Sequence, residues 1–107
     1  MFVARLRRSN LSAYRQTSSR LLEKAKPLPG FFGEDAIRTP DRRVISVSYW
    51  ADLQSIAEWR RDIEHTATRD RGRREWYEWF EVHVAKVERT ESFVFEPQPS
   101  WWQPRKR

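Results

Sequence analysis

Six side chains between Val44 and Arg89 are of types that can hold or transform a flat organic molecule. Aromatic rings stack on planar ligands, and a phenol O–H or indole N–H adds a polar edge. A histidine near neutral pH can act as a base, a proton relay or an iron ligand. Five aromatic residues and one histidine are expected near the junctions of this segment's strands and helix: Tyr49, Trp50, Trp59, His65, Trp76 and Tyr77. They predict a pocket for a small aromatic ligand, with core packing that needs no ligand as the alternative.

A β-α-β unit would gather these side chains at its junctions. The alternating run over residues 44–50 predicts a strand, with Ile45, Val47 and Tyr49 on one face. Asp52 can then cap a helix, because its carboxylate accepts from unpaired backbone N–H groups. This helix carries an apolar, core-facing stripe: Leu53, Ile56, Trp59 and Ile63. We expect it to kink or break near residues 61–66, to continue toward Gly72, and to be followed by a strand over residues 77–89.

The first half of the chain predicts three further elements before that unit is complete. Residues 2–8 alternate as a strand with Phe2, Ala4 and Leu6 on one face. Ser9 or Asn10 can cap a helix that runs through Lys26 and ends at the following Pro and Gly residues. A second strand covers 31–38, and residues 39–42 form a turn. The order β-α-β-β-α-β predicts an α+β fold of the ferredoxin-like type.

The last strand is apolar on both sides, which predicts a homodimer. One side is expected to carry Phe80, Val82 and Val84, and the other Tyr77, Trp79, Ala85 and Val87, with Glu81 and His83 between them. Two helices can cover only one face of a four-stranded sheet, and soluble monomers rarely expose a large apolar face. We therefore expect a second copy to pack sheet to sheet, with His83 in structural packing at that contact.

Residues 90–107 are expected to form an extension separate from a domain over residues 1–89. Residues 93–95 could pair as a short added strand, whereas three prolines prevent regular structure beyond it. Trp101 and Trp102 would be costly if exposed. We expect the extension to pack on its own domain or on the partner.

Composition excludes several function classes. The 107 residues suit one domain, and 14% aromatic residues can supply a core despite 34% charged ones. The chain has no Cys, no phosphate-cradling glycine pattern and no Gly-x-Ser-x-Gly elbow, so no metal site, nucleotide cofactor or hydrolase nucleophile is predicted. No membrane span or secretory signal is expected, and a cytoplasmic location is the default.

The net charge of +6 raises the question of nucleic-acid binding. Residues 1–50 hold ten Lys/Arg against four Asp/Glu, whereas residues 51–107 hold eleven of each. Mixed charges at helical spacing usually face water. We therefore expect no nucleic-acid partner.

The second half of the chain also carries a recognisable pattern. It reads Ser48-Tyr49-Trp50-x-Asp52, Ile56-x-x-Trp59-Arg60, Glu64-His65, Gly72-Arg73-x-x-Trp76-Tyr77 and Val84-x-x-Val87-Glu88-Arg89. This pattern resembles the antibiotic biosynthesis monooxygenase superfamily, in particular its small stand-alone bacterial members. The resemblance spans nearly all of residues 2–89, is more specific in the second half, and implies a dimeric α/β barrel.

The resemblance implies three alternative functions. The first is a monooxygenase that acts on a small aromatic or polycyclic substrate with no cofactor. The second is heme binding or heme degradation, for which the family uses an Asn, a Trp and a His. The third is a non-catalytic dimeric module that binds a small ligand.

Three residues are the catalytic candidates, and they are His65, Trp59 and Asn10. Asn10 and Trp59 match the family's heme-degrading positions, but Arg69 stands ten residues after Trp59, near the family's His position. His65 lies about 240° around an ideal helix from Trp59, so a kink would be needed to bring both to one cavity. A surface or capping role for His65 beside Glu64 is the alternative. Arg60 could balance a carboxylate or enolate, or could be solvated.

Overall fold

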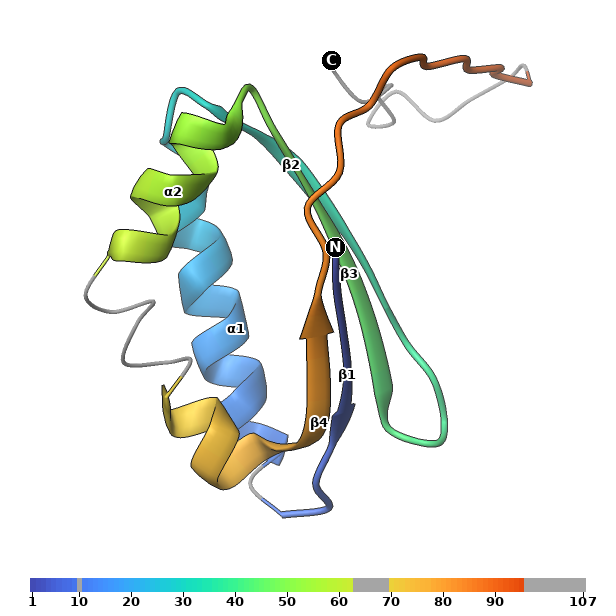
Figure 1. The fold of residues 1–107 in the computed structure, drawn as a ribbon. Helices are drawn as coiled ribbons and strands as arrows, with labels where there is room; N and C mark the ends of the chain where they lie inside the picture. Colours follow the sequence, from blue (N-terminus) through green and yellow to red (C-terminus); the bar gives the residue numbers. More distant parts are fainter. Residues whose placement is uncertain (10, 63–69, 96–107) are drawn as a thin grey trace.

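The computed structural model describes residues 1–9, 11–62 and 70–95, and within them two main helices cover one face of a four-stranded sheet (Figure 1). The sheet order is β2-β3-β1-β4, and every neighbouring pair is antiparallel. The element order confirms the predicted ferredoxin-like α+β fold. The elements are β1 (Phe2–Leu6), α1 (Leu11–Ala25), β2 (Phe31–Arg38), β3 (Arg43–Trp50), α2 (Leu53–Arg61), the π-helical turn η1 (Gly72–Trp76) and β4 (Tyr77–Val82).

The inner face of the sheet, which faces the helices, is fixed by the strand register. Ala4 of β1 pairs with Val44 of β3 and with Phe80 of β4, and directly opposed residues share a face. Ala4 and Val44 are buried, and Leu6, Tyr14, Val44 and Trp76 form one core cluster. Phe2, Ala4 and Leu6 therefore face inward together, as the alternation of β1 predicts.

Local chemistry explains where the elements start and turn. The Asp52 carboxylate accepts a hydrogen bond from the Ser55 backbone N–H at 2.8 Å, which confirms the predicted cap of α2. Gly30 lies so close to Ser55 that a Cβ on it would collide with the serine side chain. The loop between β1 and α1 is tied to η1 by Arg7, whose guanidinium donates to the carbonyl oxygens of Arg73, Arg74 and Tyr77. These contacts satisfy carbonyls that the end of a helical turn leaves unpaired.

Two β-bulges change the simple alternation of side chains. In β2 the register shifts between Phe31 and Gly33, and Gly33 takes a φ of 133°, which favours glycine. In β4 the pairing with β1 skips Glu78, so Leu6 opposes Tyr77 while Arg5 opposes Trp79. A bulge adds one residue to a strand and thereby turns a side chain to the other face.

The bulge in β4 corrects one prediction. Tyr77 does not share a face with Trp79: it lies on the inner face, where its ring is 5.9 Å from that of Tyr14. The alternating pattern predicted one shared face for the two residues because an inserted residue leaves no sign in the sequence.

The last strand is shorter than the expected span of residues 77–89. Its one neighbour is β1, whose Phe2 pairs with Val82, so later residues have no strand opposite them. The chain from His83 to Phe95 has no regular structure, and residues 93–95 do not form the expected added strand. Figure 1 shows this segment leaving the end of the sheet beside the N-terminus.

Leu53, predicted to face the core, is instead 71% exposed at the start of α2.

The outer face of the sheet carries an apolar patch that no element within the described residues covers. Ile45 and Val47 of β3 share this face, as the alternation of β3 predicts they share one, beside Val3 of β1 and the more exposed Ile37 and Trp79. Charged side chains border the patch, and they are Arg5, Asp35, Arg43 and Glu81. No helix within residues 1–9, 11–62 and 70–95 has both the length and the apolar character to cross a membrane.

Candidate functional site

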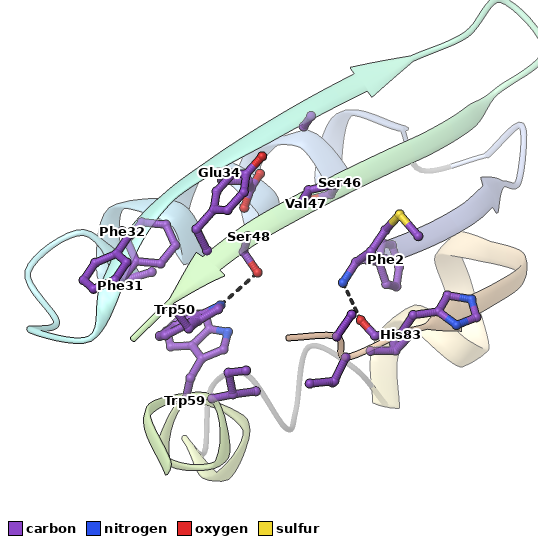
Figure 2. Close-up of a pocket in the computed structure, with 18 of the residues that line it drawn as sticks. Phe2, Phe31, Phe32, Glu34, Ser46, Val47, Ser48, Trp50, Trp59 and His83 are labelled. Carbon is purple, nitrogen blue, oxygen red and sulfur yellow. Dashed lines mark hydrogen bonds between the residues drawn. The ribbon is translucent and has the colours of Figure 1, made fainter. Parts of the chain in front are cut away.

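A large cavity lies between the helix layer and the inner face of the sheet. Its volume is about 1550 Å³, and its walls come from α1, α2, the β2–β3 hairpin and the chain just after β4. Ligand pockets usually measure about 300–1,000 Å³, so the space exceeds what one small ligand fills. The close-up in Figure 2 shows the hairpin forming one wall and α2 lying opposite.

One end of the cavity is aromatic. Trp59 of α2 and Trp50 of β3 have ring centroids 6.0 Å apart and planes tilted by 34°. Phe31 lies edge-on to Trp50 at 5.1 Å, and its inward position depends on the bulge at Gly33. Figure 2 shows Trp59 rising from α2 toward Trp50. These three rings offer the kind of surface on which a planar molecule can stack.

The wall next to this aromatic end is polar. The helix-facing positions of β3 are Val44, Ser46, Ser48 and Trp50, because Val44 and Trp50 pair inward and side chains alternate. Glu34 of β2 stands directly opposite Ser48 on the same face. The Trp50 indole Nε1 donates to Ser48 Oγ at 2.9 Å. Serine and glutamate at positions that normally hold apolar residues indicate a functional surface.

Burial raises the pKa of the Glu34 carboxyl, although a hydrogen bond from Ser46 opposes that shift and Asp35 adds to it. Desolvation disfavours the charged form of a carboxyl group. Glu34 is half-buried. The carboxyl is therefore moved toward the range in which it can exchange a proton near neutral pH.

A pair of tyrosines forms the other polar group in the cavity. Tyr14 of α1 and Tyr77 share a hydrogen bond between their hydroxyls, and Ser18 also bonds to Tyr14. Burial raises the pKa of both phenols above their ordinary value, so both stay neutral at physiological pH. The Arg38 guanidinium lies over the Tyr14 ring, 5.5 Å from its centroid. The pair can donate or accept hydrogen bonds but cannot act as a base.

Most of the predicted pocket residues reach the cavity. Trp50, Trp59, Arg60, Trp76 and Tyr77 all line it. Trp76 is also a core residue, only 2% exposed, and its Nε1 has no acceptor within the part of the chain that the structure describes.

The other predicted residues are placed differently. Tyr49 borders the cavity from a position that alternates to the outer face, where its hydroxyl donates to Asp35 Oδ2 at 3.0 Å. His83 lies just after β4, with its ring nitrogen 3.2 Å from Glu81. Asn10 and His65, two of the three catalytic candidates, fall outside the described residues.

Sequence reasoning missed Glu34, Ser46, Ser48 and Tyr14. The available signal was the alternation of β3, in which the face opposite Ile45, Val47 and Tyr49 carries two serines. If the apolar face of β3 had been assigned to the outside of the sheet, the two serines would have been predicted to line the site.

The donor set of the described residues does not build a metal site. Across residues 1–9, 11–62 and 70–95, no three His, Asp or Glu side chains cluster to hold a metal ion. For heme, the described lining offers aromatic walls and the cations Arg38 and Arg60, which could pair with propionates. Its one imidazole, His83, is engaged with Glu81. The described residues thus suit the ring and the propionates of a heme better than they suit its iron, for which they offer no imidazole except His83.

Solved structures of other proteins share this fold. A proposed antibiotic biosynthesis monooxygenase from Nitrosomonas europaea has a similar fold, with a TM-score of 0.69 at 14% identity over 84% of this chain and 89% of that one. The protein SO0527 of Shewanella oneidensis gives a TM-score of 0.66 at 15% identity, over 75% of this chain and 80% of its own. The resemblance seen in the sequence is confirmed at the level of the fold.

The sequence itself has a nearer relative. No family model matches the chain. The Bacillus subtilis protein YqjZ, itself uncharacterized, is 42% identical over 84 residues, which cover 78% of this chain and 74% of YqjZ. The chain belongs to the same family as YqjZ.

Proposed function

We propose that this protein binds a small planar aromatic molecule in the cavity and oxidises it in a monooxygenase-like reaction without a cofactor. The observation that carries the proposal is the pairing of an aromatic end, formed by Trp50, Trp59 and Phe31, with a polar wall of hydroxyls and one carboxyl. Pockets for organic ligands combine apolar walls with a few well-placed polar groups in this way. The name of the Nitrosomonas europaea relative in fold agrees with this class of reaction.

The chemistry requires a substrate that can stabilise its own carbanion. An anthrone, in which a CH₂ group lies between two aromatic rings, has this property. A base removes one proton from the CH₂ group, the electron pair remains on the substrate, and the carbanion reacts with dioxygen. One oxygen atom becomes the new carbonyl and the other leaves as water, so CH₂ and O₂ give C=O and H₂O. The protein has to position the substrate, accept the proton and exclude water.

We also propose that the working form is a homodimer joined through the outer face of the sheet. That face carries Ile45, Val47 and Val3, and none of the described elements of the same chain covers it. A second copy would remove this apolar area from water, and the hydrophobic effect favours burial in proportion to area.

Oxygen uptake with a panel of anthrones and hydroxylated polycyclic aromatics tests the enzymatic proposal. The wild-type protein should consume oxygen in proportion to product, and Trp59→Ala should slow the reaction because the planar substrate loses one wall. Glu58→Ala is the matched control, since Glu58 lies on the same helix, is exposed and does not line the cavity. Binding of these compounds without oxygen uptake would leave the non-catalytic binding module as the function.

Heme binding is the second candidate, because Trp59 lines the cavity as the family resemblance implies and two arginines lie on its walls. Titration of the protein with hemin should then shift the Soret band, and His65→Ala should change that shift. If hemin has the same absorption spectrum with and without the protein, heme binding is excluded.

A further inference from the structure

We infer that Glu34 is the proton acceptor of the cavity, and that its ligand is a neutral phenol or enol whose O–H group points to the wall made by β2 and β3. The inference rests on the proposed function, and it names both a residue and a chemical class of ligand.

The first support is the position of Glu34 in the sheet. It lies on the inner face opposite Ser48, and directly opposed side chains in an antiparallel pair are about 5 Å apart at Cβ. Ser46, the next inner position on β3, donates a hydrogen bond to its carboxylate. Figure 2 shows Glu34, Ser46 and Ser48 together on the hairpin wall of the cavity. One carboxylate and two hydroxyls therefore converge on one part of the wall.

The second support is the order of the side chains along the inner face of β3, which runs from the aromatic end of the cavity toward Glu34. Trp50 is the next inner residue after Ser48, and its indole N–H already bonds to Ser48 Oγ. A hydroxyl that accepts one hydrogen bond can still donate its own proton. A ring stacked beside Trp50 would thus place a hydroxyl substituent near Ser48 and Glu34. The same wall offers an acceptor for the substituent's proton and a donor for its oxygen.

The third support comes from the charged and titratable groups around Glu34. Tyr14 of α1 is near enough to interact with its charge, and Arg38 lies four residues further along β2 over the Tyr14 ring. Asp35, the neighbour in sequence, is directed to the outer face. Arg60 and His83 line the cavity from α2 and from the end of β4. Two other carboxylates line the cavity: Asp52, which caps α2, and Glu88, in the chain after β4. Tyr14 and Tyr77 have raised pKa values and remain neutral, so Glu34 is the anionic group of the wall formed by β2 and β3.

The transfer itself is a simple exchange of one proton. The ligand O–H bond breaks, the proton binds to a carboxylate oxygen of Glu34, and the electron pair stays on the ligand oxygen. Burial raises the pKa of Glu34 and so brings it closer to that of an acidic phenol or enol, which lowers the free-energy difference of the transfer. The resulting oxyanion can accept hydrogen bonds from the hydroxyls of Ser46 and Ser48. The enol tautomer of an anthrone gives, on loss of its O–H proton, the same anion that the keto form gives on loss of a CH₂ proton, and in the proposed reaction dioxygen then oxidises this anion.

Binding of α-naphthol and of its methyl ether, which has no O–H, tests the inference. Trp fluorescence reports both affinities, and the absorption band of the naphtholate reports proton transfer. The wild-type protein should prefer α-naphthol. Glu34→Gln should weaken α-naphthol binding roughly tenfold, since a charge-assisted hydrogen bond becomes a neutral one, with little change for the ether. The pH dependence of α-naphthol binding should also disappear in Glu34→Gln.

The control is Asp35→Asn, which removes the same charge one residue away on the outer face. It should leave the preference for α-naphthol over the ether unchanged. Equal affinity for the two ligands in the wild type and in Glu34→Gln would overturn the role of Glu34 while leaving the aromatic pocket intact. Failure of the wild-type protein to bind either ligand would overturn the proposed function as well. Circular dichroism of each variant separates loss of folding from loss of the acceptor.

Discussion

The indole rings of Trp50 and Trp59 lie 6.0 Å apart and bridge the end of β3 to α2. Trp59 comes from the helix layer and Trp50 from the sheet, so the pair joins the two layers at the aromatic end of the cavity. The same contact thus contributes both to the packing of α2 and to the wall on which a ligand would stack.

Trp59→Ala should therefore lower both stability and ligand affinity. Trp59 is half-buried, so we expect a loss of about 1–2 kcal/mol in the free energy of unfolding, less than the ~3–5 kcal/mol for a fully buried aromatic. Urea denaturation measures the stability, and α-naphthol titration measures the affinity, which should fall about tenfold. Leu53→Ala on the same helix should change the free energy of unfolding by less than about 0.5 kcal/mol. If both substitutions lower the free energy of unfolding by the same amount, the contact between Trp59 and Trp50 does not stabilise the fold.

Glu34 should make stability depend on pH. Because its pKa is raised in the folded chain, the folded state keeps this proton at pH values where the unfolded state has lost it. The stabilisation is complete below the unfolded pKa of about 4.3 and is lost as pH rises through the folded pKa. The free energy of unfolding of Glu34→Gln, relative to wild type, should therefore be higher at neutral pH than at pH ~4. Urea unfolding across this range measures the difference. A constant difference would show that Glu34 titrates normally.

A charge on the outer face should disrupt the proposed homodimer. Val47→Asp would place an unpaired carboxylate in the centre of the expected contact, and burial of such a charge costs several kcal/mol. Light scattering should show the wild type at twice the 13.0 kDa of one chain and the variant at the mass of one chain. Leu53→Asp, an equally apolar but exposed position on α2, should keep the dimer. A single-chain mass for the wild type would contradict the proposal directly.

Arg7→Lys should destabilise the turn that leads into β4. The Arg7 guanidinium donates to three backbone carbonyls, at 2.6 Å to Arg74, 3.0 Å to Tyr77 and 3.3 Å to Arg73. A lysine ammonium is compact and cannot reproduce this planar fork. We expect a loss of about 1–3 kcal/mol in the free energy of unfolding, together with a change in fluorescence because Trp76 packs beside the turn. Arg8→Lys, at an exposed neighbouring position, should have almost no effect.

The amino-acid pattern alone predicts the order of the elements and which side chains share a face in several strands. Hydrophobic alternation is a local property, so it correctly placed Phe2, Ala4 and Leu6 together, and Ile45 with Val47. Asp52 was recognisable as a cap because capping depends on only a few adjacent residues. Trp59 and Trp50, which residue type and position near the junctions predict as pocket residues, both line the cavity, and their role in ligand binding stays a prediction.

Which side of each strand lines the cavity depends on how the strands pair and where the helices pack. The two bulges turn Phe31 and Tyr77 inward, and an inserted residue leaves no sign in a period-two pattern. Glu34, Ser46 and Ser48 form one wall because β2 pairs with β3 in a particular register, whereas their sequence separation suggests no contact. The length of β4 likewise depends on its neighbour. Its pairing with β1 ends at Val82, one further pair of backbone hydrogen bonds joins His83 to Met1, and no described strand lies opposite the residues that follow.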